Sequence, residues 1–281
     1  MRTSILALAL VFSLTACTSG EVPINPAESD AHYQQALELA RHSLYQNSLQ
    51  EFDLALKHNP NNFKVYRKKG LVHFGLKQYA EAKADFQQAV AREPDNVQAH
   101  INLGMVYYVT GDKDKARNLW ERAILIREGD DDSKAYNNIA NIYKEEKNYG
   151  KAIEYYRQAI AQKPANSTYL NNLADSYRLK GDSQRAEEIL RKSLSIDSKG
   201  MLTHFNLGML FMDQKQFEKA ADSFRQSLKV NPYYTEAYLQ LAKTRLAKNE
   251  KKAALAWIEQ ALKIEPSNPA YQEFYLKVKP S

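Results

Sequence analysis

Residues 133–166 read SKAYNNIANIYKEEKNYGKAIEYYRQAIAQKPAN, and this 34-residue stretch decides the fold. Its first half carries apolar or small residues at positions 4, 7, 8 and 11, namely Tyr136, Ile139, Ala140 and Tyr143. Spacings of three, one and three residues mark one face of an α-helix. A second apolar series follows a polar break at positions 20, 24 and 27, namely Ala152, Tyr156 and Ala159. Pro164 then ends the segment, because proline does not continue a helix. The stretch therefore predicts two helices joined by a turn.

The same pattern recurs along the chain in seven copies. We expect repeats at residues 29–62, 63–96, 97–130, 133–166, 167–200, 201–234 and 235–268. The first copy departs from the pattern, with His32 at position 4 and Ser48 at position 20. The third lacks the proline, and Asp131 and Asp132 are inserted after it, so the pattern predicts a flexible joint there.

A last amphipathic helix is expected in residues 269–281. Pro269 opens it, and one face carries Tyr271, Phe274, Tyr275 and Val278. This face would cover the apolar surface of the seventh repeat, as a terminal cap does in a repeat protein.

The 34-residue pattern resembles the tetratricopeptide repeat (TPR), a helix–turn–helix unit of the same period. The resemblance covers almost the whole chain after residue 28. It implies an all-α fold: a right-handed TPR solenoid of seven helix–turn–helix repeats plus a C-terminal capping helix.

The N-terminus has the features of an export signal. Arg2 precedes a short apolar run at residues 5–14, which is too short to cross a bilayer as a helix. The run ends in Leu14, Thr15, Ala16 and Cys17, a sequence similar to the lipobox of bacterial lipoproteins. That resemblance implies a signal peptide at residues 1–16 and acylation of Cys17. The alternative is an ordinary signal peptide with an incidental cysteine, although Cys17 is the only cysteine in the chain.

Residues 17–28 are then expected to form a lipidated tether, because Pro23 and Pro26 oppose regular structure. Thr18 follows the cysteine where an aspartate would favour the inner membrane in the sorting rule for such lipoproteins. The resemblance therefore implies a bacterial outer-membrane lipoprotein that faces the periplasm.

No pattern of catalytic residues emerges. The six histidines have no metal-ligand spacing, and no glycine-rich phosphate loop is present. Asp130, Asp131 and Asp132 lack the alternation of a calcium loop and are interpreted as a polar loop before a helix. We therefore expect no enzyme activity, no cofactor and no metal.

The formal net charge is +6, and the C-terminal half is the more basic. It could face an anionic lipid or an acidic partner, or be an ordinary solvated surface. Nucleic acid is not an expected partner.

A series of amides marks the predicted binding face. At about 100° per residue, positions 2, 5, 6, 9, 12 and 13 of each first helix lie opposite the core face. Asparagine occupies position 6 in four consecutive repeats, as Asn102, Asn138, Asn172 and Asn206. The central two repeats add Asn137, Asn141, Lys144, Asn171, Asp175 and Arg178 on the same face.

An asparagine amide can donate to and accept from a peptide backbone, whatever the side chains of that peptide. The series resembles the asparagine ladder by which the TPR superhelix of O-linked N-acetylglucosamine transferase holds extended peptides. The alternative is that these amides bond only to water or to a neighbouring helix.

Apolar residues flank the asparagines on the same face. They are Ile101, Met105, Tyr108 and Val109 in the third repeat and Phe205, Met209 and Met212 in the sixth. Flexible methionines and aromatic rings suit the binding of apolar side chains. They could equally pack onto adjacent helices.

Two classes of function follow. The first is a membrane-tethered scaffold that binds extended protein segments and assists assembly of an envelope complex. The lipobox, tether, TPR body and C-terminal aromatic helix resemble the type IV pilus assembly lipoproteins, the PilF/PilW pilotins. That family has closer to six repeats. The second is an adaptor or regulator of a peptidoglycan hydrolase or a polysaccharide-export machine. In both classes the partner is a protein.

Overall fold

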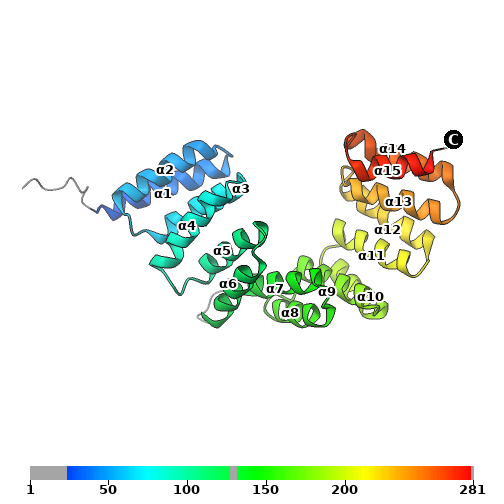
Figure 1. Cartoon of the computed structure of the whole chain (residues 1–281), viewed down its shortest axis with the longest axis horizontal. Helices are drawn as coiled ribbons and strands as arrows, with labels where there is room; N and C mark the ends of the chain where they lie inside the picture. The colour runs from blue at the N-terminus through cyan, green and yellow to red at the C-terminus, as the bar shows by residue number, and fades with distance from the viewer. Residues whose placement is uncertain (1–23, 127–131, 280–281) are drawn as a thin grey trace, which may run out of the picture. The chain divides into compact units, whose positions relative to one another are not determined.

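The computed structural model describes residues 24–126 and 132–279. The proposed signal peptide, Cys17 and most of the predicted joint, residues 127–131, lie outside the described residues. Within the described ranges the chain is all-α, with fifteen helices and no strand. Successive helices pack as antiparallel pairs, each pair being one repeat (Figure 1). The described chain divides into two compact units, the first ending at Arg92 and the second beginning at Glu93.

Unit 1 contains the first two repeats. Its helices are α1 (Pro26–Arg41), α2 (Tyr45–His58), α3 (Phe63–Gly75) and α4 (Tyr79–Arg92). Phe52 of α2 is fully buried at the centre of the first core cluster, where it packs with Ala36, Leu49, Ala55, Val65 and Val72.

Unit 2 contains the other five repeats and the last helix. The first helices of its repeats are α5 (Val97–Val109), α7 (Ser133–Glu145), α9 (Ser167–Lys180), α11 (Met201–Asp213) and α13 (Thr235–Ala247). Their partners are α6 (Lys113–Ile126), α8 (Tyr149–Gln162), α10 (Ser183–Ile196), α12 (Phe217–Val230) and α14 (Lys251–Ile264). The first helices α7, α9, α11 and α13 contact one another in sequence, so their polar faces form one continuous surface.

The two helices of a repeat approach closely because position 8 is small where position 24 is large. A Cβ on Gly104 would lie 2.4 Å from Nε1 of Trp120, which is far inside van der Waals contact. The indole N–H of Trp120 donates to the carbonyl of Ile101 at 3.0 Å, so the buried ring keeps its hydrogen bond. The small residues at position 8 thus set the distance between the two helices of a repeat.

The turn inside every repeat has one shared geometry. The residue at position 15 has a positive φ in all seven repeats: Ser43 (62°), Lys77 (60°), Gly111 (93°), Lys147 (59°), Gly181 (91°), Lys215 (58°) and Asn249 (61°). The next N–H bonds back to the carbonyl of position 11, as Asn148 does to Tyr143 at 2.8 Å. This is the Schellman ending of a helix, which satisfies carbonyls that the helix leaves free.

The first repeat begins earlier than the sequence predicted. Helix α1 starts at Pro26, so residues 26–28 are helical and the expected tether end at Glu28 is wrong. Proline is tolerated in the first helical turn, where its missing N–H has no intrahelical partner. Asn25 caps the helix, because its Oδ1 accepts from the Glu28 N–H at 3.3 Å. Ser48 is fully buried and donates to the Ala36 carbonyl at 2.8 Å, which explains a hydroxyl at position 20.

Helix α15 (Pro269–Val278) confirms the predicted cap. Tyr271 and Val278 are buried, and Phe274 and Tyr275 pack against the cluster that α13 and α14 form. In the described chain, none of the helices combines the length and hydropathy that a membrane span requires.

Candidate functional site

The first helices of unit 2 enclose a hollow of about 260 Å³ on their polar face. It lies over α7, α9 and α11, the centre of the predicted asparagine series. Eight sequence-predicted residues line it together: Lys144, Asn171, Asn172, Asp175, Arg178, Phe205, Asn206 and Met209. Thr168 and Leu202 complete the lining. Three helices that are far apart in sequence therefore place their predicted groove residues around one space.

The asparagines form a hydrogen-bonded chain between neighbouring repeats. Asn172 donates from Nδ2 to Oδ1 of Asn137 at 3.0 Å, and Asn137 donates from Nδ2 to Oδ1 of Asn138 at 3.4 Å. Asn137 and Asn138 are buried, each less than 10% exposed. The alternative of bonding to a neighbouring helix thus holds for this part of the series. Asn138 is only 8% exposed and is not part of the lining of the hollow, so its predicted contact with a partner backbone stays a prediction.

Other amides keep their hydrogen-bonding capacity. Asn171 is only 5% exposed, and its Oδ1 is buried without a hydrogen-bond partner. Asn206 is half-buried and has no hydrogen bond to any described residue, and the Oδ1 of Asn172 is likewise unbonded there. A buried amide without a partner costs free energy, about 1–3 kcal/mol, unless a ligand or water satisfies it. All three line the hollow, which makes them its hydrogen-bonding groups.

The charged residues of the site neutralise one another. Asp175 accepts from Lys144 Nζ at 3.2 Å and from Arg178 Nη2 at 2.8 Å, while Arg178 Nη1 also bonds Asp213 at 2.6 Å. Burial lowers the pKa of Arg178, but its bonds to Asp213 and Asp175 outweigh burial and raise the pKa above the usual value. Two cations face two carboxylates, so the hollow favours an uncharged segment at its centre.

The flanking apolar residues divide between the core and the hollow. Ile101 is 3% exposed and belongs to the core between α5, α6 and α7. The Phe205 ring packs at a tilt against Phe224 and edge-to-face against Tyr234, at centroid distances of 5.5 and 5.1 Å, and Phe205 also lines the hollow with Met209. The sulfur of Met212 lies 3.0 Å from the hydroxyl of Thr244 on α13, which donates to the Gln240 carbonyl at 2.6 Å. Packing onto adjacent helices therefore accounts for Ile101 and Met212.

Several predicted site residues lie outside the hollow. Asn141 accepts from the hydroxyl of Tyr156, a core residue of its own repeat, at 2.5 Å. Tyr108 donates to Glu145 on the next first helix, and burial and then that bond raise the pKa of Tyr108 to about 12. Asn102 and Met105 are half-buried on α5 and are not part of the lining.

Sequence reasoning missed three members of the site. Thr168 and Leu202 both occupy position 2, which is on the polar face of the helical projection, so the signal was present. Asp213 at position 13 completes the charge network through Arg178. Among the described residues, no group of three histidine, cysteine or acidic side chains could hold a metal ion. The chemistry that this site supports is reversible hydrogen bonding and apolar contact.

Solved structures of low sequence identity share the fold. A tetratricopeptide repeat protein from Parabacteroides merdae matches with a TM-score of 0.72 at 14% identity, over 90% of this chain and 99% of that one. A structure from a functional characterization of Pseudomonas aeruginosa pilF matches with a TM-score of 0.62 at 18% identity, over 76% of this chain and 97% of that one.

A chain of the APC/C hetero-tetramer Cut9-Hcn1 matches with a TM-score of 0.71 at 18% identity, over 90% of this chain. This chain spans only 46% of the length of that structure. No curated protein matches the sequence.

Sequence profiles described as tetratricopeptide repeat match residues 67–133, 133–166, 155–188 and 211–277. Together they cover more than half of the chain, and the match at residues 133–166 spans the helix pair α7 and α8. TPR arrays generally serve as surfaces for protein–protein interaction, and enzyme activity is not their usual role. The chain belongs to the tetratricopeptide repeat family.

Proposed function

We propose that this protein is a membrane-anchored scaffold that holds an extended segment of a partner protein against α7, α9 and α11. The observation that carries the proposal is the group of amides that line the hollow: the Asn171 Oδ1 is buried without a hydrogen-bond partner, and half-buried Asn172 and Asn206 lie beside it. Asn171, Asn172 and Asn206 retain hydrogen-bonding groups there, and an extended peptide backbone presents one N–H and one C=O per residue to meet them.

The surroundings of the amides suit an uncharged, partly apolar segment. Leu202, Phe205 and Met209 offer apolar contact at the α11 side of the hollow. Lys144 and Arg178 on the other side are already paired with Asp175. A charged ligand side chain placed at the centre would have to compete with these ion pairs, whereas an apolar or small one would not.

The anchor is proposed to be acylated Cys17, which places the scaffold on the periplasmic face of the bacterial outer membrane. The lipobox resemblance and the absence of any other cysteine support this assignment. More than one acyl chain is needed for stable anchoring, because one chain binds a membrane only marginally. The resemblance of the lipobox, tether, TPR body and C-terminal aromatic helix to the type IV pilus assembly lipoproteins supports assembly of an envelope complex, such as type IV pilus or secretin biogenesis, as the role. The pilF structure from Pseudomonas aeruginosa shares the fold.

Photo-crosslinking in living cells tests the groove. A photoreactive amino acid at Thr168, an exposed residue of the lining, should capture a partner, and the same amino acid at exposed Gln226 on α12 serves as the matched control. The capture at residue 168 should fall about tenfold or more in an Asn171→Ala/Asn206→Ala background. Capture from both sites alike, or capture that the double substitution leaves unchanged, contradicts the groove assignment.

A separate variant tests the anchor. Cys17→Ser removes the sulfur that would be acylated, so the protein should move from the detergent-rich to the aqueous phase of a detergent partition. Thr18→Ser, which leaves the cysteine in place, is the control and should stay in the detergent-rich phase. If Cys17→Ser still partitions with detergent, the lipid assignment is wrong, while the groove assignment stands or falls on the crosslinking.

A further inference from the structure

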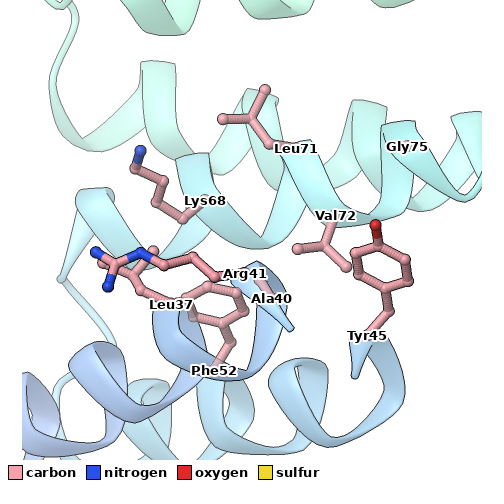
Figure 2. A pocket seen from close by; sticks show the side chains of 9 residues that line it. All are labelled: Leu37, Ala40, Arg41, Tyr45, Phe52, Lys68, Leu71, Val72 and Gly75. Atoms are coloured by element: carbon pink, nitrogen blue, oxygen red, sulfur yellow. The ribbon is translucent and has the colours of Figure 1, made fainter. Parts of the chain in front are cut away.

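A second hollow lies in unit 1 and is chemically unlike the first. Its volume is about 450 Å³, and it is enclosed by α1, α2 and α3. Figure 2 shows the fully buried ring of Phe52 at its floor, with Leu37, Ala40 and Val72 around it. The exposed side chains of Leu71 and Tyr45 are each 39% accessible, so apolar surface at the rim faces solvent.

Two cationic side chains stand at one side of this apolar floor. In Figure 2 the Lys68 ammonium and the Arg41 guanidinium lie on the same side, opposite the Tyr45 hydroxyl. Arg41 pairs with Glu38 at 2.5 Å, but Lys68 has no carboxylate partner among the described residues. Burial, and then the charge of Arg67, lowers the pKa of the Lys68 ammonium. Helix α3 itself contains no acidic residue that could compensate this charge.

A half-buried cation without a counter-ion is destabilised, and a carboxylate within about 4 Å would relieve that cost. The apolar floor next to it would gain from a large aliphatic or aromatic side chain, at roughly 25 cal/mol per Å² of apolar surface removed from water. We propose that this hollow is a docking site for a partner segment that carries a large apolar side chain beside an acidic one. The apolar side chain fills the space above Phe52, and the carboxylate pairs with Lys68.

A second copy of the chain and an anionic lipid are the alternative occupants of this hollow, and the experiment distinguishes each of them from an acidic peptide segment.

The experiment selects ligands without assuming a sequence. A library of random ten-residue peptides displayed on phage is bound to the purified full chain. Each bound clone is then tested for binding to the double variant Lys68→Gln/Leu71→Ser. Leu71 is exposed and Lys68 is a half-buried cation without a counter-ion in the described chain, so the double variant should melt at or above the temperature of the parent. Clones lost on the variant should carry Leu, Ile, Phe or Met within two residues of Asp or Glu. A synthetic peptide from such a clone should bind Lys68→Gln about tenfold more weakly, and the loss should shrink at high salt.

Two control variants test whether the selected peptide binds at this hollow. Lys57→Gln removes an exposed lysine of α2 outside the hollow and should leave the affinity unchanged. Asn171→Ala/Asn206→Ala should also leave it unchanged, so failure here is distinct from failure of the groove in unit 2.

Three results would overturn the proposal. The first is the absence of clones that depend on Lys68 and Leu71, or dependent clones without a carboxylate. The second is a self-association, seen by sedimentation, that the double variant abolishes, because the occupant would then be a second copy. The third is variant-sensitive binding to vesicles of phosphatidylglycerol in phosphatidylcholine without any peptide binding, because the occupant would then be an anionic lipid.

Discussion

Asn172 on α9 donates a hydrogen bond to Asn137 on α7 at 3.0 Å, so two amides from consecutive repeats are joined directly. Both belong to the predicted ligand-binding face, yet here they hold neighbouring first helices together. The bond leaves the Oδ1 of Asn172 available in the hollow and fixes its direction. Part of the asparagine series therefore positions the rest.

This bond predicts coupling between the two residues. Asn137→Ala should lower the free energy of unfolding by about 1–3 kcal/mol, because it leaves the Asn138 oxygen buried without a donor. Asn172→Ala should cost less, and the two losses should be non-additive by about 0.5–1 kcal/mol in a double-mutant cycle. Urea unfolding of the four proteins measures this coupling. Strictly additive losses would show that the bond contributes nothing.

The repeated turn predicts that a glycine at position 15 is stabilising. Lys147 adopts φ 59°, where its Cβ is strained, while Gly181 occupies the equivalent position at φ 91°. Lys147→Gly should therefore raise the free energy of unfolding by about 0.5–1 kcal/mol, and Gly181→Ala should lower it by a similar amount. Thermal melts of the two variants check this, and a destabilised Lys147→Gly would contradict it.

The packing of Gly104 against Trp120 predicts intolerance of one methyl group. Gly104→Ala would place a Cβ 2.4 Å from the indole nitrogen, so it should destabilise the chain by about 1–3 kcal/mol despite the better helix propensity of alanine. Gly75→Ala is the control, because no atom lies within 4 Å of its added Cβ, and it should be neutral or stabilising. Equal melting temperatures for both variants would mean that the helices can move apart freely.

Tyr108 predicts a stability loss at alkaline pH. Its pKa of about 12 in the folded protein exceeds the usual value of 10. Below pH 10 the phenol is protonated in both states, and between pH 10 and 12 only the unfolded chain ionises, so stability falls as the pH rises. Tyr108→Phe should remove part of that slope when urea midpoints at pH 9 and pH 11 are compared. An identical slope in the variant would rule out a contribution from this hydroxyl.

The fold was predictable because its determinants are local and periodic. In each repeat a small residue at position 8 faces a large residue at position 24, as in the pairs Gly104 with Trp120 and Ala140 with Tyr156. The whole repeat has a period of 34 residues. The start of α1 at Pro26 was missed because proline was taken as a breaker, although it is favoured in a first helical turn. The left-handed residue of each turn was also missed, because lysine or serine occupies it in four of the seven repeats and glycine or asparagine in only three.

The site was predictable in its residues but not in their bonding. Helical projection placed Asn138 and Asn172 on one face, yet it cannot show that Asn137 lies between them and bonds both. Nor can it show that Asp175 neutralises Lys144 and Arg178, because those bonds depend on how consecutive first helices are offset. The hollow above Phe52 in unit 1 arises from side chains of three helices that no single periodicity connects.

The central claim is that the amides of the hollow bind the backbone of a partner segment. The segment recovered by crosslinking at residue 168 can be made as a peptide and as a series of copies, each N-methylated at one backbone amide inside the hollow. Asn171→Ala/Asn206→Ala should melt at or above the temperature of the parent, because neither side chain bonds a described residue and the substitution removes the unpaired buried oxygen of Asn171.

Titration of the peptides with the parent protein and with this double variant is the most direct measurement. At least one methylated copy should bind the parent about tenfold or more weakly than the unmodified peptide does, and should bind the double variant with nearly the same affinity as the unmodified peptide. Equal affinities of all the peptides for the parent, or a methylation loss that persists unchanged in the double variant, would contradict the account.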